Sequence, residues 1–61
     1  MEIAISFDDP EFQLRYLIEV VEGHAKDVFI DGDRRELIVV DPDEYLLEEL
    51  ENRGIKYRRV D

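Results

Sequence analysis

Hydrophobic and polar residues alternate from Met1 to Phe7, which is the pattern of a β-strand with one buried face. The segment from Ile55 to Val60 alternates in the same way. Between them, two short runs rich in branched apolar residues flank an Asp-Gly turn. The sequence therefore predicts four strands, at Met1–Phe7, Lys26–Ile30, Glu36–Val40 and Ile55–Val60.

Two further segments carry apolar residues at the three- and four-residue spacing of an amphipathic helix. The inward positions are Leu14, Leu17, Ile18 and Val21 in the first segment and Leu46, Leu47 and Leu50 in the second. We expect Gly23 and Gly54 to end these helices, because glycine readily adopts the left-handed conformation that follows a helix C-terminus.

Both predicted helices begin with the same signal, an aspartate followed by a proline. We expect Asp9 and Asp41 to be N-caps that accept hydrogen bonds from the free amides of the first turn. Pro10 and Pro42 suit the first helical position, where the missing N–H would have no intrahelical partner. Glu44 follows Asp41 by three residues, at the spacing of a capping box.

The elements follow one another as βαββαβ within a single domain, residues 1–61. Two right-handed crossovers joined by a hairpin predict an α+β, ferredoxin-like two-layer sandwich with both helices on one face of an antiparallel sheet. The predicted strand order is 4-1-3-2, which places the most apolar strands in the centre. The edge strands then carry charged residues that discourage edge pairing, namely Lys26, Asp27, Lys56, Arg58 and Arg59.

Several local signals follow the rules of idealised backbones. They are Asp9-Pro10-Glu11, Asp41-Pro42-Asp43-Glu44, the Asp31-Gly32 turn and the Arg53-Gly54-Ile55 exit. In these residues, and over nearly its whole length, the chain resembles the idealised ferredoxin-like domains made by de novo design. The resemblance implies a folded scaffold with no catalytic function, no cofactor and no required partner.

Length and charge narrow the classes of function. The 61 residues carry seventeen acidic and eight basic side chains, a net charge of -9 that repels phosphate backbones and anionic membranes. We therefore expect no nucleic acid and no membrane as a partner. The chain has no cysteine, no apolar run of about 20 residues and no signal-peptide pattern at Met1-Glu2. We expect a cytoplasmic or recombinant protein.

Residues able to perform catalysis are scarce. Ser6 is the only serine and His24 the only histidine, and the predicted elements separate them, so we expect no nucleophile and base pair. Two acidic clusters offer paired carboxylates for hydrolysis, but helix capping explains their positions. The clusters are Asp8, Asp9 and Glu11, and Asp41, Asp43 and Glu44. The sequence predicts that the protein is not an enzyme.

No motif indicates a metal ion or a phosphate. Asp31-Gly32-Asp33 begins like a calcium loop, but a calcium loop needs oxygen ligands over about 12 residues, and Arg34 and Arg35 stand in their place. We interpret this segment as a turn. The loop after the first strand, Asp8-Asp9, contains no glycine and would repel a phosphate group. We expect no cofactor.

Natural families with this topology use residues that the chain lacks. Acylphosphatases place an arginine, and copper chaperones a CxxC motif, where this chain has Asp8-Asp9. RNA-recognition motifs stack bases on third-strand aromatics, but this strand is Leu37-Ile38-Val39-Val40. A regulatory dimer resembling the amino-acid-binding ACT domains is a further hypothesis, although Asp8-Asp9-Pro10 does not match their glycine-bearing ligand loop.

Strand alternation predicts apolar side chains on the open face of the sheet. The residues expected to face the helices are Ile3, Ile5, Val28, Ile30, Leu37, Val39, Ile55 and Tyr57, which leaves Ala4, Phe29, Ile38, Val40 and Val60 outside. Such a patch usually marks an interface. We predict a homodimer interface at Phe29, Ile38, Val40, Lys56 and Arg58.

Two alternatives to this interface remain open. The aliphatic stems of Lys56 and Arg58 could cover the patch, or a hairpin loop of three or five residues could exchange the inward and outward sets. A different class of function is a natural acidic protein-interaction module, a small inhibitor or nucleic-acid mimic whose helical carboxylates bind a basic partner. A mimic would present carboxylates in rows, whereas arginines interrupt them here.

Overall fold

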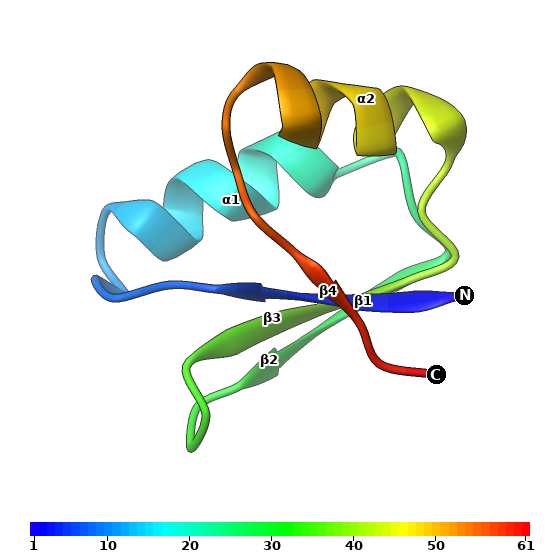
Figure 1. The fold of residues 1–61 in the computed structure, drawn as a ribbon. Helices are drawn as coiled ribbons and strands as arrows, with labels where there is room; N and C mark the ends of the chain where they lie inside the picture. Colours follow the sequence, from blue (N-terminus) through cyan, green and yellow to red (C-terminus); the bar gives the residue numbers. More distant parts are fainter.

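The computed structural model describes all 61 residues, and its elements follow the predicted βαββαβ order (Figure 1). The elements are β1 (Glu2–Ser6), α1 (Gln13–Val21), β2 (Asp27–Asp31), β3 (Glu36–Val40), α2 (Glu44–Asn52) and β4 (Arg58–Arg59). The four strands form one antiparallel sheet in the order β2-β3-β1-β4, which is the predicted 4-1-3-2 order. The α+β prediction is confirmed, and the strand order is consistent with a ferredoxin-like fold.

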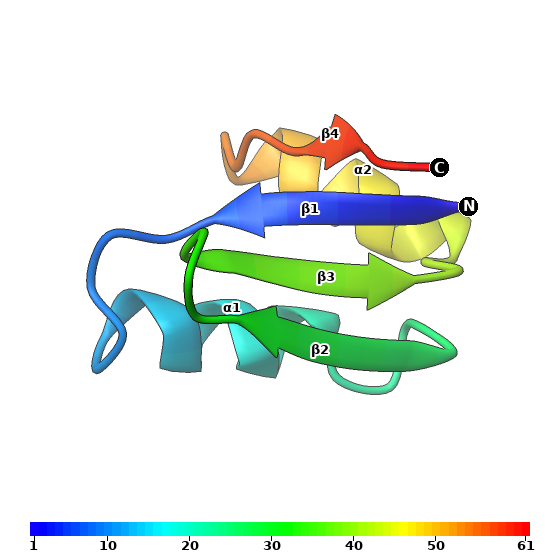
Figure 2. The ribbon, with the colours of Figure 1, turned by 90° about the horizontal axis from the view of Figure 1, so that it is seen from below.

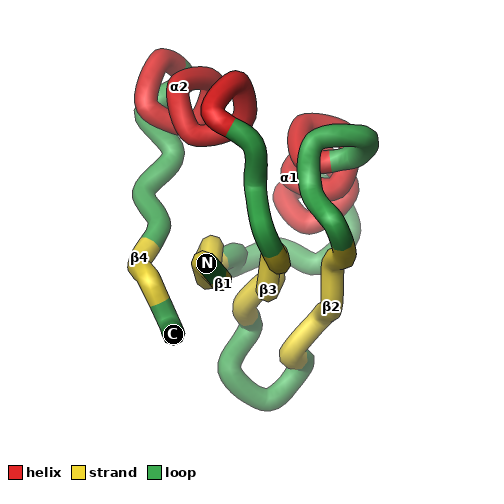
Figure 3. The backbone as a smooth tube through the Cα atoms, turned by 90° about the vertical axis from the view of Figure 1, so that its right-hand side faces the viewer, coloured by secondary structure: helices red, strands yellow, loops and turns green.

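The two helices form one layer and the sheet forms the other (Figure 3). The core lies between the layers, where apolar side chains lose contact with water and so stabilise the fold. It consists of Ile3, Ile5, Phe7, Leu17, Val21, Leu37, Val39, Leu46 and Leu50. Neither helix is long and apolar enough to cross a membrane.

The inward and outward residues of the central strand β3 are the predicted ones. A loop of four residues, 32–35, joins β2 to β3 and pairs Asp31 with Glu36. An even loop keeps Leu37 and Val39 on the buried side and leaves Ile38 and Val40 on the other face. The alternative of a three- or five-residue loop is therefore excluded.

The turn itself differs from the predicted Asp31-Gly32 hairpin. The left-handed residue of the loop is Arg35, with a φ of 53°, and Gly32 does not have a positive φ. Asp31 stabilises the loop in another way, because its Oδ1 atom accepts a hydrogen bond of 3.2 Å from the Arg34 amide.

Ile30, at the end of β2, lies on the helix side of the sheet as predicted, but no helix covers it. Ile30 is 56% exposed, although its neighbour on β3, Leu37, is fully buried. The twist of the sheet turns the hairpin end of β2 and β3 away from α1 (Figure 1), so the helix does not cover Ile30. The predicted inward residues Val28 and Tyr57 pack only at the margin of the core.

Helix α1 begins at Gln13, three residues later than the Asp9-Pro10 signal predicts. The Asp9 carboxylate does accept backbone hydrogen bonds, with Oδ1 lying 2.8 Å from the Glu11 amide and 3.3 Å from the Phe12 amide. Asp9 therefore caps a turn that precedes the helix. The helix N-cap is Phe12, which makes no side-chain capping bond.

Helix α2 is capped by Asp43, not by Asp41. The Oδ1 atom of Asp43 accepts a hydrogen bond of 2.8 Å from the Leu46 amide. Asp41 instead adopts a left-handed conformation with a φ of 49°, and its carboxylate lies 2.7 Å from the Met1 ammonium group. Aspartate tolerates this conformation better than most residues, and the chain uses it to turn out of β3. The predicted capping box with Glu44 does not form.

Strand β4 is shorter than the predicted Ile55–Val60. Gly54 has a φ of 70°, and the Ile55 amide donates a 2.8 Å hydrogen bond to the Leu50 carbonyl oxygen at the end of α2. Residues 55–57 then descend from the helix layer to the sheet (Figure 1), so pairing with β1 begins only at Arg58.

Candidate protein-interaction surface

The face of the sheet opposite the helices is uncovered (Figure 2). Because directly opposed residues share a face, the register arranges its side chains in rows across the sheet. The central row is Phe29, Ile38, Ala4 and Arg58. The row toward the hairpin is Asp31, Glu36 and Ser6, and the third row is Asp27, Val40 and Glu2. The predicted positions Phe29, Ile38, Val40 and Arg58 therefore do lie on one face.

Exposure varies strongly along the central row. Phe29 is 55% exposed, Ile38 is half-buried and Ala4 is only 2% exposed. Val60 follows Arg58 by two residues, so strand alternation places it on the same face, where its amide donates to the Glu2 carbonyl oxygen. We call Phe29, Ile38, Val40 and Val60 the open-face patch.

An ion pair borders the open-face patch on the side of β4. The Arg58 guanidinium donates from Nε to Glu36 Oε2 at 3.1 Å and from Nη2 to Glu36 Oε1 at 2.9 Å. Glu36 is only 7% exposed, whereas the Arg58 side chain is half exposed. The hydrogen bonds to Glu36, and then its charge, raise the pKa of Arg58 above its ordinary value. Glu36 was not predicted to belong to this surface. It lies two residues before Ile38 on β3, so strand alternation places both side chains on the same face.

The predicted cover by basic side chains forms over one half of the face only. Arg58 reaches across β1 to Glu36, and with it Lys56, Ala4 and Ser6 line a shallow depression of about 200 Å³. Lys56 makes no ion pair. The half of the face that contains Phe29 has no such cover, since Phe29 remains more than half exposed.

The free edge of β2 is blocked at one amide. Phe29 and Ile38 are opposed in the register, and alternation of the ladder turns the backbone groups of Val28 and Ile30 toward the outer edge. The Asp27 carboxylate accepts the Val28 amide at 2.9 Å. This contact occupies a donor that an added strand would need, so the edge is a poorer docking site than the face.

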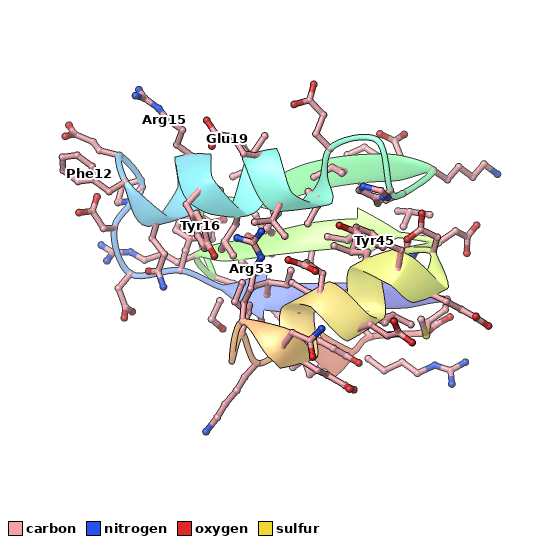
Figure 4. The ribbon with its side chains drawn as sticks, turned by 90° about the horizontal axis from the view of Figure 1, so that it is seen from above. Phe12, Arg15, Tyr16, Glu19, Tyr45 and Arg53 are labelled. Carbon is pink, nitrogen blue, oxygen red and sulfur yellow. The ribbon has the colours of Figure 1, made fainter.

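On the helical side, Arg53 joins the two helices near the α2 C-terminus (Figure 4). Its Nη1 atom donates to the Tyr16 hydroxyl at 2.8 Å, and its Nε atom lies 2.6 Å from Glu49 Oε1. These bonds, the one to the Tyr16 hydroxyl first, raise the pKa of Arg53. Phe12 projects from the end of this layer and is 76% exposed.

At the opposite end of the helical layer, His24 contacts the start of α2. His24 Nδ1 lies 3.1 Å from Asp43 Oδ2, and its ring centroid is 4.6 Å from that of Tyr45. The Asp43 amide also donates to the His24 carbonyl oxygen. The hydrogen bond from Leu46, followed by that from His24, lowers the pKa of Asp43.

The residues considered for catalysis do not come together. Ser6 lies at the C-terminal end of β1. His24 contacts Asp43, close to Asp41, whose amide donates to the Met1 carbonyl oxygen beside the N-terminal end of β1. The two acidic clusters also lie at these opposite ends. Asp9 and Asp43 accept hydrogen bonds from nearby backbone amides, and Asp41 accepts one from the Met1 ammonium group. No group of three or more His, Asp or Glu side chains has an arrangement that could hold a metal ion.

No protein family, no curated protein and no solved structure matches this chain.

Proposed function

We propose that this chain is a non-catalytic, ferredoxin-like protein-interaction module that binds through the open-face patch. The observation that carries the proposal is the exposure of Phe29, a large aromatic side chain at 55%, on a sheet face without a covering layer. Phe29 is opposed to the half-buried Ile38, so the two side chains form one continuous apolar surface. Aromatic residues surrounded by polar groups are characteristic of protein interfaces.

The surroundings of the open-face patch support this proposal. Asp27 and Asp31 lie beside it on β2, and the Glu36 and Arg58 pair closes its other side. An apolar centre with a charged rim is the usual anatomy of an interface between proteins. By contrast, four of the side chains considered for catalysis already have structural partners. Asp9 and Asp43 accept backbone amides, Asp41 pairs with the Met1 ammonium group and His24 contacts Asp43.

An idealised, de novo designed scaffold would have the same fold but would need no partner. Two features favour the interaction module over such a scaffold. Arg35 and Asp41 are non-glycine residues with positive φ values of 53° and 49°, which idealised backbones avoid. In addition, a scaffold without a partner gains nothing from an exposed Phe29.

The acidic helical face is a weaker candidate for the same role. Arg15 and Arg53 interrupt its carboxylates, and Glu49 is already paired with Arg53. A basic partner would therefore meet a surface of mixed charge and would be held mainly by exposed ion pairs, which contribute little.

A retention experiment with matched variants tests the proposal. The immobilised parent, Phe29→Lys and Phe12→Lys are each incubated with cell lysate and with an untagged copy of the chain. Phe12 is the control because it is an exposed phenylalanine outside the sheet. We expect a stoichiometric partner that Phe29→Lys loses and Phe12→Lys keeps. Equal retention by all three proteins contradicts the proposal. The absence of any retention also contradicts it if the chain shows no Phe29-dependent self-association at about 2 mM.

A further inference from the structure

Resting on the proposed function, we infer that the partner of the open-face patch is a second copy of this chain, related by a two-fold axis parallel to the strands. Charge is distributed asymmetrically across the open face of the sheet. The β2 side carries Asp27 and Asp31, and the β4 side carries Arg58 and Lys56. The acidic residues are thus separated from the basic residues by the width of the sheet.

Two aligned ways of stacking the sheets face to face are available to a two-fold pair. An axis perpendicular to the strands places β2 over β2 of the second copy. In the observed register this sets Asp27 over Asp31 of the second copy, twice, and Arg58 over its own equivalent. Like charges in direct opposition weaken association, so this arrangement is unfavourable.

An axis parallel to the strands, running between β3 and β1, places β2 over β4 and β3 over β1 of the second copy. Asp31 then lies over the Lys56 region, and Phe29 lies over Arg58, where a guanidinium can stack on the aromatic ring. No like charges are directly opposed in any row. The charge distribution therefore selects this axis.

The shape of the central row fits the same axis. Ile38 and Ala4 are neighbours in the register, and the parallel axis places each over the other residue of the second copy. A large side chain then meets a small one at both central positions, as in interdigitating sheets. The perpendicular axis would instead set each residue of this row over its own equivalent, with two large side chains in contact at Ile38 and a gap at Ala4.

The size of the face limits the affinity. Four strands about 4.8 Å apart and five residues at about 3.3 Å give a face of roughly 19 by 17 Å. This is well below the roughly 800 Å² that each partner buries in a standard interface. We therefore expect a weak dimer, with a dissociation constant on the order of 0.1 to 1 mM.

Sedimentation equilibrium from about 20 µM to about 2 mM measures the self-association of the chain and so tests the inferred dimer. Asp31→Lys and Lys56→Asp should each weaken self-association at least about fivefold, because each creates two like-charged contacts. An equimolar mixture of the two variants should recover the parent's association, since every exchanged charge then meets its opposite. Thermal unfolding of each variant verifies that it is folded, and the double variant Asp31→Lys with Lys56→Asp should also self-associate.

The outcomes separate this inference from the proposed function. A parent that stays monomeric at about 2 mM, or a mixture no better than the single variants, overturns the inference. If lysate retention still depends on Phe29 in that case, the proposed function stands with a different partner. If neither self-association nor retention depends on Phe29, both fail.

Discussion

Glu36 and Arg58 form a bidentate ion pair that crosses β1, with hydrogen bonds of 2.9 and 3.1 Å. Glu36 belongs to β3 and Arg58 to β4, and the strand between them presents only Ala4 and Ser6 beneath the pair. Small side chains at these two positions leave the guanidinium room to reach the carboxylate. The pair thus attaches a strand of only two residues to the rest of the sheet.

Loss of this pair should destabilise the fold. Arg58→Ala removes the partner of the Glu36 carboxylate. A buried carboxylate without a counter-charge is unfavourable because little water reaches it. We expect the Tm to fall by about 5 to 10 °C, as followed by circular dichroism. The matched control is Arg59→Ala, because Arg59 is paired only with the exposed Asp61. Equal Tm values for the two variants would show that the Glu36 and Arg58 pair contributes no more than an exposed pair.

The reassigned helix cap predicts a difference between two substitutions at Asp43. Asp43→Ala removes the acceptor for the Leu46 amide and should lower the Tm by about 4 to 8 °C. Asp43→Asn keeps a side-chain oxygen at the N-cap and should retain most of the stability. Thermal unfolding of both variants checks the assignment, and an alanine variant as stable as the asparagine variant would contradict it.

The lowered pKa values of three aspartates predict weakening in acid. Hydrogen bonds from the Met1 ammonium, from the Leu46 amide and from Arg59 lower the pKa of Asp41, Asp43 and Asp61 respectively, in the last case to about 2. A carboxyl with a lower pKa in the folded state stabilises the fold above its unfolded pKa, near 3.8, and loses that contribution as the pH falls.

Urea unfolding at a series of pH values measures this effect. The midpoint should be constant well above the unfolded pKa of about 3.8 and should fall steadily toward about pH 2. In Asp43→Asn the fall should be smaller, since one of the three groups no longer titrates. A midpoint that rises on acidification would refute the assigned hydrogen bonds.

The helix α2 core contacts predict a contrast between adjacent leucines. Leu46 is fully buried and Leu47 is only half-buried, although the sequence pattern placed both inward. Leu46→Ala should destabilise the domain by about 2 to 5 kcal/mol, and Leu47→Ala by clearly less. For Leu17, which is also buried, we expect a loss like that of Leu46. Chemical denaturation measures all three, and a larger effect at Leu47 would mean that the helix is rotated.

Periodicity was sufficient to predict the inward faces of the central strands, and the element order with right-handed crossovers was sufficient to predict the strand order. Leu37 and Val39 follow directly from two-residue alternation, because one face of each central strand must be buried. Ile30 obeys the same alternation but lies on an edge strand, where twist of the sheet decides whether a helix covers it. Twist is a property of the assembled sheet, so it cannot be predicted from the local pattern of hydrophobic and polar residues.

The errors at the helix starts have a different origin. Asp41 and Asp43 are both good cap residues, and only the path of the chain out of β3 assigns the left-handed turn to the first and the cap to the second. The Glu36 and Arg58 pair likewise depends on register across β1, and these residues are 22 positions apart in the sequence. Local reasoning could place each residue on a face but could not pair them.

The Asp27 carboxylate that accepts the Val28 amide determines how this protein would behave in concentrated solution. One amide on the β2 edge is already bonded, and the other edge of the sheet ends in the two-residue strand β4. Neither side therefore offers a long continuous template for adding further strands. Growth into fibrils, which requires strand upon strand along a continuous edge, is therefore disfavoured. The inferred contact through the face would end at a closed pair, so we expect crowded solutions of this protein to stay clear and not to form a gel.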